Sequence, residues 1–139
     1  MTNLEQQRIL VVDDERVIAD TIGAILRKAG FTVDVAYNGL AAMESARCNR
    51  PTLVLSDVVM PGMDGVEMAI LLRREQPDCR ILLFSGQAAT ANLLRKARLL
   101  GHNFHIIAKP VHPQELIRYI RDAVQTAPAT EHTGPAVAS

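Results

Sequence analysis

The segment LVLSDVVMPGMDG, from Leu53 to Gly65, decides how the rest of the sequence is interpreted. A short, mostly apolar run ends in an aspartate, and a Met-Pro-Gly turn and a second aspartate follow it. A carboxylate at the end of a buried apolar segment costs free energy unless another group pairs with it. Asp57 therefore predicts that partner groups from other parts of the chain converge on this point.

Four other apolar runs resemble the one that ends at Asp57. Three of them are nearly continuous in Val, Ile and Leu, which is typical of strands buried on both faces of a parallel sheet. The fourth, TVDVA, alternates between apolar and polar residues, which favours a position near the edge of the sheet. In chain order the five runs are RILVVDD (8–14), TVDVA (32–36), TLVLSD (52–57), RILLFSG (80–86) and FHIIAKP (104–110).

A helix is predicted after each of these runs, because apolar residues recur there at spacings of three and four. Gly30, Pro51 and Gly101 follow the first, second and fourth helical segments as stop signals. Asp64 and Glu67 have the spacing of a capping box, which predicts that the third helix begins between them.

The alternation of strand and helix predicts a single α/β domain. We expect a doubly wound, five-stranded parallel sheet of the flavodoxin-like order 2-1-3-4-5, with five helices covering its two faces. The chain has 139 residues, which fits one domain at 8–125 between an N-terminal tail at 1–7 and a C-terminal tail at 126–139. The C-terminal tail lacks apolar periodicity and is predicted to be disordered.

Composition excludes several function classes. The formal net charge is zero, Trp is absent and aromatic residues make up 4%, so no direct DNA binding is predicted. Cys48 and Cys79 form no CxxC pattern and are interpreted as free thiols in a reducing compartment. No apolar run is long enough for a signal peptide or a membrane span. We therefore expect a cytoplasmic protein without a membrane segment.

Polar residues end four of the five runs, at the edge of a parallel sheet where ligands bind. Asp13 and Asp14 end the first run, Asp57 the third, Ser85 the fourth and Lys109 the fifth. In the order 2-1-3-4-5, the acidic pair lies about 5 Å from Asp57, and Ser85 lies next to Asp57 on the other side. The Lys109 backbone is about 10 Å away, a distance that a lysine stem largely covers.

A crowded group of carboxylates without Cys or His predicts a site for a hard cation. Mg²⁺ fits best, because it takes one or two protein carboxylates, keeps several waters and shares phosphate oxygens. A carboxylate beside Mg²⁺ and a lysine is equipped as a nucleophile for phosphoryl transfer. In this interpretation Ser85 donates a hydrogen bond to one oxygen of the transferred group.

Four motifs together resemble the receiver domain of two-component response regulators. They are VVDD (11–14), the D-x-x-MPGMDG pattern (57–65), SG (85–86) and KP (109–110). The resemblance extends over residues 8–125. It is carried by the whole set, with the D-x-x-MPGMDG pattern as the most specific part.

The resemblance implies a role for each residue at the predicted edge. In the family, the residue at the position of Asp57 accepts a phosphoryl group from the phosphohistidine of a sensor histidine kinase or of a phosphotransfer protein. The residues at Asp13 and Asp14 hold Mg²⁺ together with the phosphorylated aspartate and the main-chain carbonyl at the position of Val59. The lysine at Lys109 contacts the phosphoryl group, and its bond to the following proline is usually cis.

The resemblance also implies how the signal leaves the domain. The residue at Ser85 moves toward the phosphoryl group and alters the face made by the fourth helix, fifth strand and fifth helix. In the family that face binds a downstream protein, whose identity here is unknown. Members often dimerise through the same face, so the resemblance implies a monomer or a weak dimer. One position departs from the family, because Ile106 stands where an aromatic residue usually reports the state of the switch.

Three alternatives remain at this point. Asp14 would be only the N-cap of the first helix. The whole domain would be a receiver-like interaction module that works without phosphorylation, and Ile106 favours this. A phosphatase or flavin protein on a related fold is disfavoured, because Val59 replaces a second acid and the acidic loop repels phosphate. The leading interpretation is a stand-alone receiver, a signalling switch that catalyses only its own phosphorylation and dephosphorylation rather than an ordinary enzyme.

Overall fold

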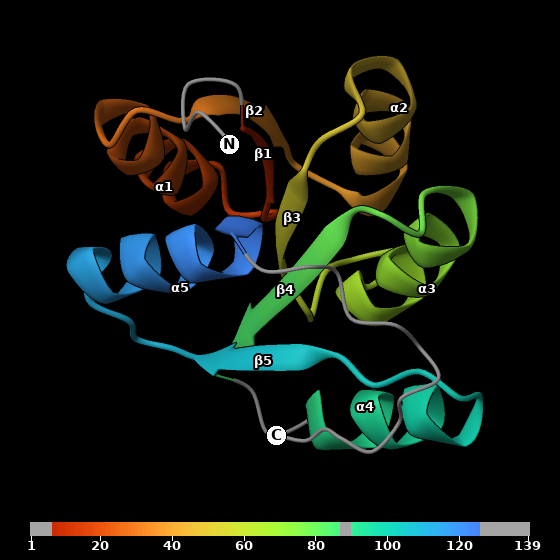
Figure 1. Cartoon of the computed structure of the whole chain (residues 1–139). Helices are drawn as coiled ribbons and strands as arrows, with labels where there is room; N and C mark the ends of the chain where they lie inside the picture. Colours follow the sequence, from red (N-terminus) through yellow and green to blue (C-terminus); the bar gives the residue numbers. More distant parts are fainter. Residues whose placement is uncertain (1–6, 87–89, 126–139) are drawn as a thin grey trace.

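The computed structural model describes residues 7–86 and 90–125, in which five strands and five helices alternate as predicted (Figure 1). The strands are β1 (Arg8–Val12), β2 (Thr32–Ala36), β3 (Leu53–Asp57), β4 (Arg80–Ser85) and β5 (His105–Ala108). The helices are α1 (Arg16–Lys28), α2 (Gly39–Asn49), α3 (Gly65–Glu75), α4 (Thr90–Leu99) and α5 (Pro113–Gln125). The predicted tails lie outside the described residues, apart from Gln7, which is buried.

All strand pairs are parallel, and the sheet has the predicted order β2-β1-β3-β4-β5. The alternating run TVDVA forms the edge strand β2, as expected. β1 and β3 are neighbours, so their carboxyl ends meet at one edge of the sheet. Within the described parts of the chain, no helix is long and apolar enough to cross a membrane.

Each strand divides its side chains between two helical layers, because successive residues of a strand point to opposite faces. Ile9 and Val11 of β1 belong to a core that includes residues of α1 and α5. Leu10 and Val12 belong to a second core that includes residues of α2, α3 and α4. Figure 1 shows α1 and α5 on one side of the sheet and the other three helices on the opposite side.

The starts of two helices test the capping predictions. The Asp64 carboxylate accepts a hydrogen bond from the Glu67 backbone N–H at 2.8 Å, and Glu67 accepts from the Asp64 N–H at 3.0 Å, which confirms the capping box. The interpretation of Asp14 as the N-cap of α1 is wrong. Glu15 occupies that position without a side-chain cap, and the Asp13 carboxylate accepts the Glu15 N–H at 2.9 Å.

The helix α3 begins directly against the end of β3, and Gly65 permits this approach. The Gly65 N–H donates to the Val58 carbonyl at 2.8 Å. A Cβ atom at position 65 would overlap the carbonyl oxygen of Asp57. Both atoms in that overlap are fixed by the backbone, so no side-chain rotation relieves it. The absence of a side chain at Gly65 therefore permits the path that the backbone takes between Asp57 and α3.

We predict that Gly65→Ala lowers the free energy of unfolding by about 2–3 kcal/mol, because the added methyl group forces the end of β3 and the start of α3 apart. Urea unfolding followed by circular dichroism measures the change. Gly86→Ala is the matched control, since its Cβ would lie 3.4 Å from the Lys109 Cβ, an ordinary contact. Equal losses in the two variants would contradict the close approach at Gly65.

Candidate functional site

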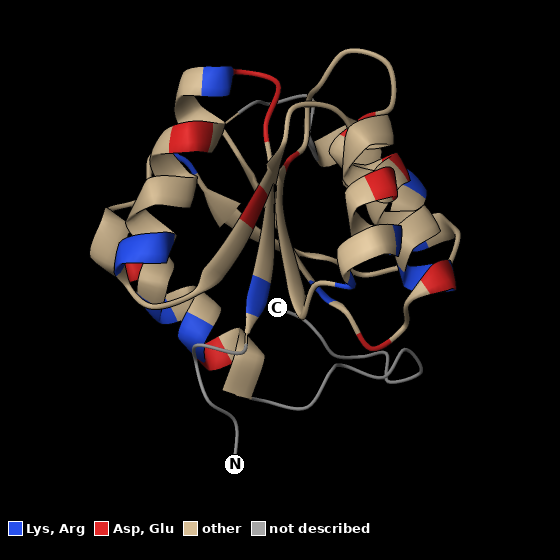
Figure 2. Cartoon of the chain, turned by 90° about the horizontal axis from the view of Figure 1, so that it is seen from above, with Lys and Arg blue, Asp and Glu red and all other residues tan. Residues whose placement is uncertain are grey.

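Three carboxylates meet at the carboxyl edge of β1 and β3. Asp57 is the last residue of β3, and Asp13 directly follows β1, one step beyond the register pair of Val12 and Ser56. Carboxylate oxygens of Asp13, Asp14 and Asp57 lie within 4.8 Å of one another. Asp13 and Asp57 are buried and Asp14 is exposed, so the cluster opens to solvent on one side. Figure 2 shows the acidic segment after β1 as a red loop.

Lys109, which follows β5, reaches back to this cluster. Its ammonium Nζ lies 3.0 Å from Asp57 Oδ1 and 3.7 Å from Asp13 Oδ2. The side chain of Lys109 is 26% exposed, whereas that of Asp57 is 11% exposed. One ammonium group therefore faces two buried carboxylates, and the local charge at the edge remains negative.

The pKa of the Asp13 carboxyl group is raised in the folded chain. Burial raises the pKa of its carboxyl group, and the nearby charge of Asp57 raises it further, whereas the Glu15 N–H and Lys109 act in the opposite direction. Its Oδ2 atom is buried and has no hydrogen-bond partner within the described residues, although Lys109 is at ion-pair distance. A buried carboxylate oxygen of this kind is suited to a cation.

The donor set fits a hard divalent ion. All three side chains offer carboxylate oxygens, and Asp13 Oδ2 is available for coordination. Val59, two residues past Asp57, is 36% exposed. Mg²⁺ binds carboxylate and carbonyl oxygens and keeps several waters, which suits a cluster that is partly open to solvent.

Ser85 ends β4 and is buried, but its register differs from the expectation. We expected Ser85 beside Asp57, whereas the register pairs Asp57 with Phe84 and places Ser85 one residue farther along. The reason is that the register begins with Leu53 and Arg80, so the six-residue β4 extends beyond the five-residue β3.

The ends of β4 and β5 are linked through the backbone. The Lys109 N–H donates to the Ser85 carbonyl at 3.3 Å. The Lys109–Pro110 bond is cis, as the resemblance implied. Ile106 pairs in register with Leu83 and packs against the core of the α2, α3 and α4 layer. Ser85 and Lys109 are therefore neighbours through the backbone. Ile106 shares the face of Leu83 and Ser85, whereas Lys109 continues the face of Ile107.

Sequence reasoning missed Phe84. Its ring centroid lies 4.6 Å from the Lys109 Nζ, and the residue is 3% exposed. The available signal was an aromatic residue directly before Ser85, after a run of three aliphatic residues. That signal does not by itself reveal the contact, because residues 84 and 109 meet only through the pairing of β4 with β5.

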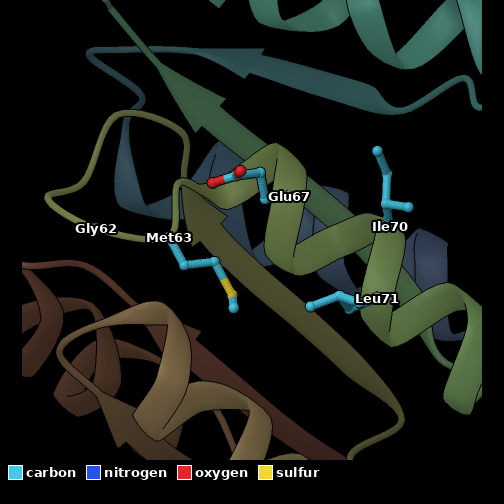
Figure 3. Close-up of a pocket in the computed structure, with 5 residues that line it drawn as sticks. All are labelled: Gly62, Met63, Glu67, Ile70 and Leu71. Atoms are coloured by element: carbon cyan, nitrogen blue, oxygen red, sulfur yellow. The ribbon is translucent and has the colours of Figure 1, made fainter.

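A separate hollow of about 480 Å³ borders α3 and the loop that precedes it. Figure 3 shows Met63 from the preceding loop and Leu71 from α3 pointing toward each other across it. Gly62, Glu67 and Ile70 complete its lining, so none of the clustered carboxylates borders it. The hollow is mainly apolar and takes no part in the charged site.

Comparison with curated proteins gives relatives among transcriptional regulators. The chain is 34% identical over 113 residues to a probable transcriptional regulatory protein, TcrX, of Mycobacterium tuberculosis, covering 81% of this chain and 47% of that protein. It is 33% identical over 116 residues to the DNA-binding response regulator MtrA of Mycolicibacterium paratuberculosis, covering 84% and 50%. The chain thus spans about half the length of these relatives.

A similar solved structure and the matching family model are also of response regulators. A CheY-like response regulator receiver domain protein from Methanospirillum hungatei superposes with a TM-score of 0.77 at 27% identity, covering 86% of this chain and 94% of that one. The family model described as the response regulator receiver domain matches residues 9–121. The chain therefore belongs to the family of response regulator receiver domains.

Proposed function

We propose that this receiver domain is a signalling switch in which Asp57 accepts a phosphoryl group from the phosphohistidine of a sensor kinase or a phosphotransfer protein. The observation that carries the proposal is the ion pair of 3.0 Å between Lys109 and Asp57, beside two further carboxylates. This arrangement offers a nucleophilic oxygen, a cation for the transferred group and a set of metal ligands at one point.

In the proposed reaction, an Asp57 carboxylate oxygen attacks phosphorus, and the bond from phosphorus to the donor imidazole nitrogen breaks. The electron pair of that bond returns to the imidazole, and an acyl phosphate remains on Asp57. Lys109 neutralises charge on the phosphoryl oxygens and restrains the carboxylate before transfer. Asp13, Asp14, Asp57 and the Val59 carbonyl would hold Mg²⁺, which when bound supplies additional positive charge to the phosphoryl oxygens.

We propose that Ser85 and Lys109 respond to phosphorylation of Asp57 and thereby change the protein surface that partners contact. A phosphoryl group adds a charge of about −1.5 to −2 and three strong acceptor oxygens, and these two residues are the nearby donors. Their backbone hydrogen bond links the ends of β4 and β5. Movement of either residue would bias the face formed by α4, β5 and α5, where a downstream protein or a second copy would bind.

The output of this chain is also part of the proposal. The two curated relatives described above are named as a probable transcriptional regulatory protein and a DNA-binding response regulator, and each is about twice as long as the matched part. For this chain we retain signalling through protein–protein contact without direct DNA binding. The stand-alone status, the monomeric or weakly dimeric state and the cytoplasmic location stay predictions.

A second candidate function is supported by Ile106. If the usual aromatic reporter is needed for switching, a chain with Ile106 on β5 would act as an interaction module that works without phosphorylation. The two candidates differ in one measurable property, which is the chemical modification of Asp57.

We predict that acetyl phosphate with Mg²⁺ adds the mass of one phosphoryl group to the native chain and none to Asp57→Ala. Intact-mass spectrometry detects the gain, and chelation of Mg²⁺ abolishes it. Hydroxylamine removes an acyl phosphate but not a phosphoserine, so sensitivity to it separates modification of Asp57 from modification of Ser85.

Asp64→Asn is the matched control for this experiment, because it changes a neighbouring carboxylate that caps α3 and retains the acceptor oxygen. It is expected to gain the same mass as the native chain. No mass gain in the native chain, together with measurable Mg²⁺ binding, would instead support the interaction module.

We predict that Asp13→Asn stabilises the metal-free protein at pH 7 by about 1 kcal/mol. A carboxyl group whose pKa is raised by folding binds its proton more tightly in the folded chain. Its contribution to stability is therefore lost as the pH rises from the ordinary aspartate pKa through the raised pKa of Asp13. Above the raised pKa the charged carboxylate opposes folding, and the neutral amide avoids that cost. Urea unfolding at pH 7 and pH 4 measures the difference, which shrinks at the lower pH.

Mg²⁺ is expected to reverse that order. At about one hundred times its dissociation constant, the ion raises the free energy of unfolding of the native chain by about 2.7 kcal/mol. Asp13→Asn should gain much less, because one ligand has lost its charge. Asp122→Asn, which changes an exposed carboxylate on α5, serves as the control and should gain as much as the native chain. Equal gains in all three proteins would argue against a metal role for Asp13.

A further inference from the structure

The strand β4 lies between the strand that carries Asp57 and the strand that precedes Lys109. Phe84 is the register partner of Asp57 on one side and of Ile107 on the other. Lys109 follows Ile107 by two residues. The lysine must therefore reach across the level of Phe84 to place its ammonium group 3.0 Å from Asp57 Oδ1.

Phe84 and the charged groups occupy the same face of the sheet. Phe84, Leu55 and Ile107 belong to the core shared with α1 and α5. Because side chains alternate along each strand, Asp57 and Lys109, each two residues beyond a member of that core, continue the same face. The ring of Phe84 is thus the last apolar surface before the charged edge.

The contact between the two residues is a cation–π interaction. The Lys109 Nζ lies 4.6 Å from the ring centroid, within the distance at which the negative face of an aromatic ring attracts an ammonium group. The ring is buried, so water screens this attraction weakly. Lys109 is therefore held by three groups: the Phe84 ring, Asp57 at 3.0 Å and Asp13 at 3.7 Å.

We propose that Phe84 is a positioning residue for Lys109, whose ammonium group it holds over the Asp57 carboxylate in the place from which it meets the incoming phosphoryl group. This inference rests on the proposed phosphorylation of Asp57. An aliphatic residue would fill the same core space but would leave the ammonium to the two carboxylates alone.

The ring has an advantage over a further polar partner. Transfer requires the ammonium group to shift from an Asp57 oxygen to a phosphoryl oxygen. A ring face attracts the cation without forming a directional hydrogen bond that would have to break first. Phe84 therefore limits the freedom of a flexible lysine stem while leaving its N–H groups for the reaction.

The contact itself is tested by NMR on the native protein. Protons above an aromatic ring shift upfield, so the methylene protons next to the Lys109 ammonium should resonate upfield of their positions in Phe84→Leu. Phe84→Tyr, which keeps the ring, should retain the shift. Absence of any ring-current shift in the native protein would overturn the proposal, whatever its phosphorylation activity.

The consequence for the reaction is tested by the rate of phosphorylation with acetyl phosphate and Mg²⁺. Phe84→Leu should react about three- to tenfold more slowly than the native chain, and Phe84→Tyr should recover most of the rate. The matched control is Phe104→Leu. It removes a different ring that also lies under a cation, since Arg73 sits 4.4 Å from the Phe104 centroid. This control should keep the native rate.

The outcomes separate this inference from the proposed function. Equal slowing in Phe84→Leu and Phe104→Leu, or a native rate in Phe84→Leu, would overturn the positioning role. No phosphorylation of the native chain would contradict the proposed function itself, and the NMR measurement would then decide the contact alone. Circular dichroism of each variant verifies that the fold is retained before the rates are compared.

Discussion

The reactive edge of the sheet depends on one ammonium group that two buried carboxylates share. The Lys109 ammonium group lies between the buried carboxylates of Asp57 and Asp13, at 3.0 and 3.7 Å. The adjacency of β1 and β3 brings these two acids together, and Lys109, which follows β5, compensates them from the other side. Partial compensation leaves the cluster with a net negative charge, which is the condition for holding a divalent cation beside a reactive carboxylate.

The same alternation that builds the core also builds the site. Positions 9, 11 and 13 of the first strand segment, and 53, 55 and 57 of the third, share one face, and the first two of each triplet are apolar core residues. The last position of each triplet reaches the edge of the sheet and is an aspartate. Ser56 lies on the opposite face of β3, and its hydroxyl donates a hydrogen bond to the Asp57 carbonyl at 2.8 Å. The aspartates of the site therefore follow the same alternation as the core residues of their strands.

Much of this arrangement was accessible from the sequence, and the misses have a common origin. Periodicity predicted all ten elements. The strand order, taken as the flavodoxin-like arrangement that is common among doubly wound sheets, then placed Asp13, Asp14 and Asp57 together, because parallel strands end at one edge. It did not fix the register of β4, which places Phe84 rather than Ser85 beside Asp57. Period-two patterns assign a face but not an offset between strands. The alternative in which Asp14 caps α1 is also wrong, since Glu15 occupies the cap position and its own N–H donates to Asp13.

The division of the sheet into two layers has a consequence for how this domain can diversify. Phe84, Asp57 and the core of α1 and α5 share one side, whereas Ile106 and the helices α2, α3 and α4 share the other. Ser85 and Asp14, each two residues beyond a member of the second core, are the residues through which that layer meets the reactive edge. Both cores therefore contribute residues to the reactive edge, so a domain of this kind can vary its partner surface without disturbing the reaction mainly at exposed positions of its helices.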